Sequence, residues 1–100
     1  MKVVWSSRAQ RRLRQIYTYI AEDQPEHAKR MVNRLTQRSQ QLRTQPHLGR
    51  VVPEYAREDI RELIEGSYRI LYQLKTERIN VLTVIGGSQL LPDTAESLES

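Results

Sequence analysis

The sequence predicts an α+β fold of the order β-α-α-β-β-β, in which a helical hairpin packs on a mainly antiparallel four-stranded sheet. Three observations predict it: a short apolar run at the start, two stretches with the apolar spacing of amphipathic helices, and three stretches after Pro46 that alternate apolar and polar residues. The 100 residues suffice for one domain of this kind.

The first strand is expected at residues 2–5, because two valines and a tryptophan favour extended backbone. Ser6 and Ser7 follow, and their hydroxyl groups can accept hydrogen bonds from the unpaired N–H groups that begin a helix. Apolar residues then recur at helical spacing until about Asp23. The predicted apolar stripe of this first helix consists of Ala9, Leu13, Ile16, Tyr17 and Ile20.

A second helix is expected from Pro25 to Pro46. Proline is tolerated in a first helical turn, where its missing N–H costs no hydrogen bond, and a later proline ends a helix. One face of this second helix carries Ala28, Val32, Leu35 and Leu42. Because the linker after Asp23 is short, the two helices should pack as an antiparallel hairpin.

Three strands are expected at residues 60–64, 68–74 and 79–85, joined as an antiparallel meander. The last of them is the most apolar run of the chain and is expected at the centre of the sheet. After Pro92 the chain carries three acidic residues and no basic one. We therefore expect a single domain over residues 1–92 and an acidic, mobile tail over residues 93–100.

Charge is distributed unevenly. Residues 1–50 contain 11 lysines and arginines against 3 acidic residues, whereas residues 51–100 contain 5 against 9. A basic first half suggests an acidic partner or a polyanion.

The composition also excludes several chemistries. The absence of cysteine rules out disulfides and thiolate metal sites, and two histidines 20 residues apart do not form a metal site, so we expect no metal and no cofactor. No apolar run is long enough for a membrane span or a signal peptide, which predicts a cytoplasmic protein without membrane contact.

Motifs along nearly the whole chain resemble the ParE branch of the RelE/ParE toxin superfamily. In order, they are the WS after the first strand, the YIA that ends the first helix, the PEHA that opens the second, the PHLGR loop, the REL strand, the YRILY strand and the closing INVLTVIGG. The resemblance implies the RelE/ParE-like fold and a toxin of a type II toxin-antitoxin pair. It also implies a cognate ParD-like antitoxin, bound in a heteromeric complex.

The resemblance leaves two activities of different classes. ParE-like toxins poison DNA gyrase, whereas RelE-like relatives cut mRNA on the ribosome with an arginine and a histidine or tyrosine near the chain end. Here the segment after the last strand reads GGSQLLP, without the histidine or arginine of many relatives. We therefore expect a gyrase inhibitor without catalytic residues, not an enzyme. The alternatives are an mRNA endonuclease, and a weak or inactive toxin because many ParE-like chains also carry a basic residue there.

A plain nucleic-acid-binding domain is a third possibility, since the helices are rich in arginine. No helix-turn-helix or zinc signature supports it. The antitoxin is expected to hold the operator, so we expect no direct sequence-specific DNA binding by this chain alone.

Two groups of residues are predicted to contact partners. Arg61 and Arg69 are expected on a solvent-exposed sheet face unless they pair with Glu62 or Glu65. Trp5, Tyr17, Tyr19, Tyr68 and Tyr72 occupy positions that a core would fill, and Tyr68 and Tyr72 could also serve as apolar anchors for an antitoxin. The predicted gyrase contacts are Arg61, Arg69, Ser88, Gln89, Leu90 and Leu91, and the predicted antitoxin contacts are Arg8, Arg12, Arg34, Arg38, Tyr68 and Tyr72.

Overall fold

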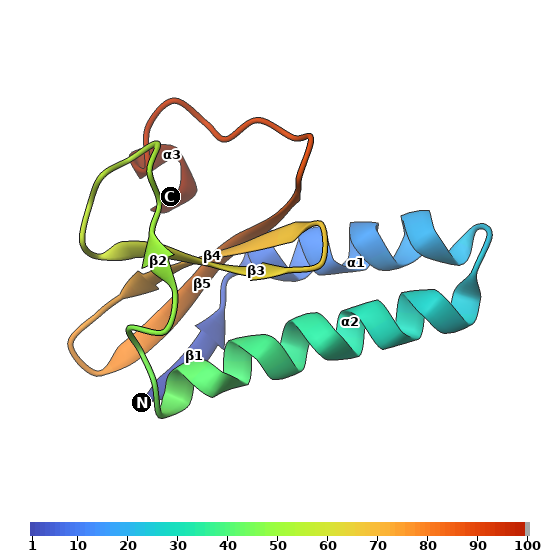
Figure 1. Ribbon diagram of the computed structural model, residues 1–100, viewed down its shortest axis with the longest axis horizontal. Helices are drawn as coiled ribbons and strands as arrows, with labels where there is room; N and C mark the ends of the chain where they lie inside the picture. Colours follow the sequence, from blue (N-terminus) through green and yellow to red (C-terminus); the bar gives the residue numbers. More distant parts are fainter. Residues whose placement is uncertain (100) are drawn as a thin grey trace.

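A computed structural model of the chain describes residues 1–99. A helical hairpin lies against one face of a sheet, and a long loop with a short helix lies beyond the other face (Figure 1). The elements are β1 (Lys2–Trp5), α1 (Ser7–Ala21), α2 (Pro25–Gln40), the 3-10 helix η1 (Gln41–Arg43), β2 (Arg50–Val51), β3 (Ile60–Glu65), β4 (Tyr68–Leu74), β5 (Arg78–Gly86) and α3 (Glu96–Glu99).

Local sequence accounts for both long helices. The Ser6 hydroxyl accepts a hydrogen bond from the backbone N–H of Ala9 at 3.0 Å, so Ser6 is the N-cap that the sequence predicts for α1. Pro25 is the first residue of α2. Ala9 and Ile16 of α1 pack against Met31 and Leu35 of α2 inside the hairpin core. The predicted hairpin is confirmed.

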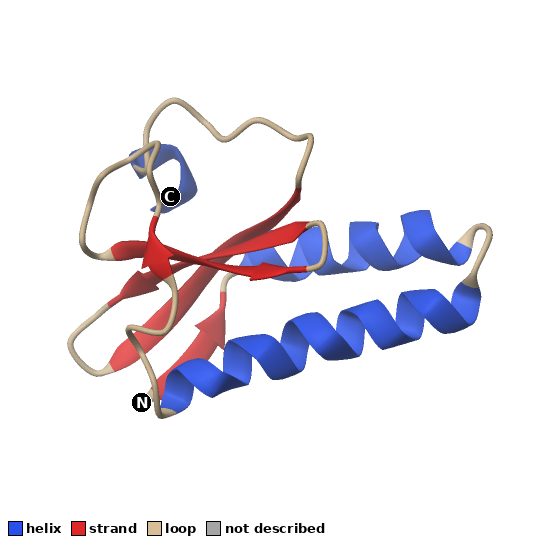
Figure 2. Ribbon diagram, viewed as in Figure 1, coloured by secondary structure: helices blue, strands red, loops and turns tan. Residues whose placement is uncertain are grey.

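The sheet has five strands in the order β1-β5-β4-β3-β2, seen in red in Figure 2. The strand β1 runs parallel to β5, and the other neighbours are antiparallel. The α+β class and the mainly antiparallel sheet are confirmed, but the predicted number of four strands is wrong. The missed strand, β2, has only two residues, which is too short for an alternating pattern.

The middle position of the sheet belongs to β4, although the sequence predicted the last strand there. β5 still lies inside the sheet, between β1 and β4. Both strands are therefore paired along both edges, which agrees with their apolar composition.

Two separate cores cover the two faces of the sheet. On β4, Ile70 and Tyr72 belong to the core beneath the helices, while Leu71 belongs to a second core on the opposite face. Ala95 and Leu98 complete this second core and are only 3% and 6% exposed. Residues 93–99 of the predicted tail therefore contribute two apolar side chains to this core, and the mobility of the tail stays a prediction.

Gly49 lies in a loop that the Tyr72 hydroxyl fixes by hydrogen bonds, and it has no room for a side chain. The backbone N–H of Gly49 donates to the Tyr72 hydroxyl at 2.9 Å, and that hydroxyl donates to the Pro46 carbonyl at 3.0 Å. A Cβ atom on Gly49 would lie 2.5 Å from the Glu62 carbonyl oxygen and 2.7 Å from the Tyr72 hydroxyl.

We expect Gly49→Ala to lower the free energy of unfolding by about 1–3 kcal/mol, the usual cost of overpacking. Gly86→Ala is the matched control, since its nearest neighbour would be 3.6 Å away, an ordinary contact. Urea unfolding of both variants measures the difference. Equal stability of the two variants would contradict this account of Gly49.

Candidate functional site

A hollow of about 640 Å³ lies where the end of β5 meets α1 and the β3–β4 turn. It brings together Arg12 and Tyr68, predicted to bind an antitoxin, with Ser88 and Gln89, predicted to bind gyrase. Residues from both predicted groups therefore line one surface. We call this hollow the terminal pocket.

Arg12 and Gln89 shape the terminal pocket. The Arg12 guanidinium donates through Nε to the Val84 carbonyl at 3.0 Å and through Nη2 to the Gln89 side-chain oxygen at 2.8 Å. The same Gln89 oxygen accepts from the backbone N–H of Gly86 at 2.7 Å. One amide thus fastens the segment after β5 to α1, so this segment is positioned by side-chain contacts.

Tyr19 is a residue of the terminal pocket that sequence reasoning assigned to the core. Its side chain is 76% exposed and lines the pocket with Tyr68. On a helical wheel Tyr19 lies to one side of the stripe that Leu13, Ile16 and Ile20 form. This offset is the signal in the sequence that Tyr19 is exposed. The core assignment is also wrong for Tyr17, which is 37% exposed.

Leu90 and Leu91 follow the pocket residues but lie in different surroundings. Leu90 is 94% exposed, whereas Leu91 packs against the second core. Arg8 lies apart from the terminal pocket, because its guanidinium donates to the Ser97 carbonyl at 2.6 Å.

Arg61 and Arg69 do not form the joint surface that the sequence predicted. The register of β3 with β4 pairs Arg61 with Tyr72 and Arg69 with Ile64, which places the two arginines on opposite faces of the sheet. Their side chains are only 14% and 18% exposed. The expected solvent-exposed face with both arginines is therefore absent.

Each of these arginines is held within the molecule. Arg69 donates twice to Glu54, at 3.0 Å each, and once more to Glu62, so its pairing with Glu62 is as anticipated. The guanidinium of Arg69 lowers the pKa of Glu54. Arg61 donates to the Gly49 carbonyl at 3.0 Å and to the carboxylate of Glu58 at 3.1 Å.

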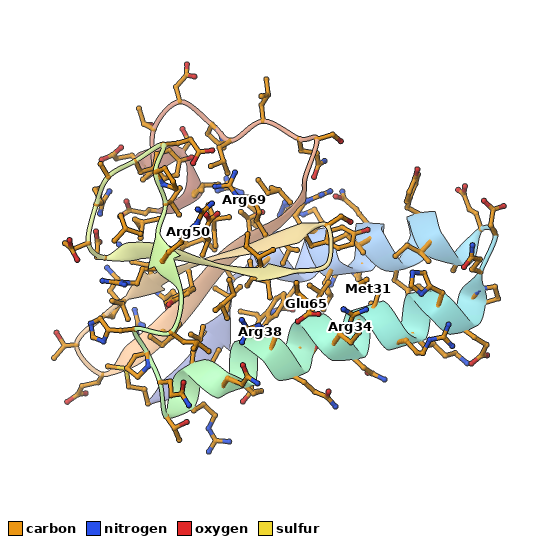
Figure 3. All side chains as sticks on the ribbon, in the orientation of Figure 1. Met31, Arg34, Arg38, Arg50, Glu65 and Arg69 are labelled. Carbon is orange, nitrogen blue, oxygen red and sulfur yellow. The ribbon has the colours of Figure 1, made fainter. Side chains whose placement is uncertain are left out.

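Arg34 and Arg38 reach from α2 toward Glu65 at the end of β3, as Figure 3 shows. The Arg34 Nη2 atom lies 2.5 Å from a Glu65 carboxylate oxygen, and the Arg38 Nε atom lies 3.7 Å from the other oxygen. Arg34 remains 51% exposed and can still meet a partner.

The prediction that Tyr72 contacts an antitoxin is wrong. It is fully buried, and burial raises the pKa of its hydroxyl. A side chain that fills the core beneath the helices and anchors the Gly49 loop presents no surface to an antitoxin.

Residues 1–99 contain no group of three or more histidine, cysteine, aspartate or glutamate side chains placed to hold a metal ion. Over the same residues, no helix is both long and apolar enough to cross a membrane. The terminal pocket combines side-chain amides with aromatic and guanidinium groups, and the latter two are enriched at protein interfaces. These features define a small α+β protein with a surface suited to a macromolecular partner.

The chain belongs to the ParE toxin family: the model described as "ParE toxin of type II toxin-antitoxin system, parDE" matches residues 3–91. A solved structure titled "Chromosomal ParDE TA system from P. aeruginosa" has the same fold, with a TM-score of 0.74. The two chains are 21% identical, and the match covers 86% of this chain and 95% of that chain. No curated protein matches the sequence. The resemblance inferred from the motifs is confirmed.

Proposed function

We propose that this chain inhibits DNA gyrase by binding it, without catalysis of its own, and that a ParD-like antitoxin neutralises it. The family membership supports a toxin of a type II system. The residues that line the terminal pocket support gyrase rather than mRNA as the target of the toxin. The segment after β5 contributes Ser88 and Gln89, which supply neither an imidazole nor a guanidinium. The guanidinium of Arg12 comes from α1 and is engaged by the Val84 carbonyl and the Gln89 side chain.

The antitoxin is proposed to cover the same terminal pocket. The solved relative comes from a ParDE system, which supports a ParD-like partner. Tyr19 and Tyr68 offer apolar contact area beside the guanidinium of Arg12. An antitoxin segment seated there would keep gyrase from Ser88 and Gln89, and both encounters would take place in the cytoplasm.

The gyrase proposal is tested by supercoiling and DNA cleavage assays with the purified chain, beside an mRNA cleavage assay on translating ribosomes. We expect inhibited supercoiling, trapped cleaved DNA and intact mRNA. Ribosome-dependent mRNA cuts with normal supercoiling would overturn the proposal in favour of the endonuclease. Inactivity in both assays would identify a weak or inactive toxin.

The antitoxin proposal is tested with Tyr19→Ala, which truncates an exposed side chain of the terminal pocket. We expect binding of the co-encoded antitoxin to weaken roughly tenfold or more, as for truncation of an interface tyrosine. Tyr17→Ala is the matched control, because Tyr17 is on the same helix but does not line the pocket. Equal affinities of the two variants in calorimetry would place the antitoxin elsewhere.

A further inference from the structure

A second hollow lies at the other end of the sheet, near the start of α1 and the β4–β5 turn. It consists of two adjoining hollows of about 630 and 680 Å³ that share Val4, Lys75 and Arg78. Figure 1 shows β1 and the β4–β5 turn side by side at this end, and Lys2 lies opposite Arg78 in the strand register. We call it the basic groove, after its cationic side chains Lys2, Arg8, Arg11, Lys75 and Arg78.

The cations of the basic groove differ from most other cations of the protein in having no carboxylate partner. Within residues 1–99, every ion pair uses a lysine or arginine outside the groove. The groove has two carboxylates at its wall, Glu77 and Glu99, and Glu99 already pairs with Arg57 at 2.7 Å. Unpaired like charges around one hollow create a positive potential that an anion would relieve.

The basic groove is lined by two side-chain amides beside the apolar Val4, Leu82 and Leu98. Gln73 of β4 and Asn80 of β5 are register partners, and both line the groove. The Gln73 amide already donates to the carboxylates of Asp59 and Glu99, so Asn80 is the amide left for a ligand. Arginine, lysine and side-chain amides are the groups that bind phosphate and sugar oxygens along a nucleic-acid strand. No aromatic residue lines this groove, so it lacks the side chains that most often anchor a peptide partner.

We propose that the basic groove binds the phosphodiester backbone of a nucleic acid without reading its sequence. The groove is distinct from the terminal pocket, with which it shares no lining residue. The proposal is independent of gyrase inhibition, and it agrees with the expectation that this chain does not recognise an operator sequence.

The test compares two triple variants of the full chain that lose the same charge. The groove variant is Arg11→Gln, Lys75→Gln and Arg78→Gln, and the control is Arg14→Gln, Arg30→Gln and Arg43→Gln. All six side chains are exposed and outside the ion pairs of residues 1–99, so neither variant disturbs the core. Circular dichroism is used to check that both variants are folded.

Fluorescence anisotropy measures binding of a labelled random-sequence duplex of about 20 base pairs between roughly 50 and 200 mM salt. We expect the groove variant to lose roughly tenfold or more in affinity and to flatten the slope of log K against log salt by about 2–3. The control should lose less than about threefold and keep its slope. The same measurement with single-stranded RNA of equal length shows whether the groove prefers DNA or RNA.

Absence of binding by the unaltered protein to both nucleic acids would overturn the proposal. Equal losses in the two variants would also overturn it, because they would show that diffuse charge and not the groove binds. If the groove variant keeps its nucleic-acid affinity but loses binding of the antitoxin, the groove serves an acidic protein segment instead.

Discussion

Replacing Arg50 and Arg69 together by glutamine is expected to lower the free energy of unfolding by about 3–5 kcal/mol. The Glu62 side chain is 0% exposed and lies between these two arginines, which approach its two carboxylate oxygens. Arg50 Nε is 2.6 Å from one oxygen, and Arg69 Nε donates to the other. Without both guanidinium groups, a buried carboxylate is left without an opposite charge, and its desolvation is uncompensated.

Adding Glu62→Gln to this double variant is the control, because it removes the buried charge itself. We expect the triple variant to regain most of the lost stability in urea unfolding. A double variant as stable as the unaltered chain would contradict the role given to Glu62. The same experiment bears on Arg69 as a predicted gyrase contact, since reduced gyrase inhibition by an Arg69 variant is informative only when its stability is known.

Leu98→Ala is expected to destabilise the protein by about 2–3 kcal/mol, within the range for truncating a buried leucine. Leu98 is 6% exposed and packs in the second core with Leu71 of β4 and Leu82 of β5. Truncation would open a cavity on the face of the sheet opposite the helices.

Leu90→Ala is the matched control, because the same substitution at a side chain that is 94% exposed should change stability by less than about 0.5 kcal/mol. Urea unfolding of both variants measures the contrast. Equal stability of the two variants would show that the tail does not contribute to folding, as the expectation of a mobile segment requires.

The elements with a long, regular pattern were predictable from the sequence. Both helices of the hairpin combine a serine cap or an initial proline with several turns of apolar spacing, so their existence follows from local physics. β2 and α3 are not predictable in this way, because two and four residues give no period. Tertiary contacts stabilise these short elements instead. In α3, for example, Leu98 packs in the second core.

The candidate site was predicted less well, for a related reason. The motif matches drew attention to Arg61 and Arg69 as a pair, but a two-residue turn at Gly66–Ser67 places Arg69 opposite Ile64 and separates their faces. That separation could have been worked out from the turn length. By contrast, the meeting of Arg12 with Gln89 joins positions 77 residues apart and follows only from the folded arrangement.

The short strand β2 also bears on how the protein resists aggregation. A sheet whose outermost strand offers a long row of unpaired N–H and carbonyl groups can pair with a second molecule. β2 covers Arg61 and Glu62 of β3, while Arg34 and Arg38 of α2 pair with Glu65 at the other end of that strand. On this side of the sheet the outermost strand is only two residues long and carries the charged Arg50, which disfavours edge-to-edge pairing with a second molecule there.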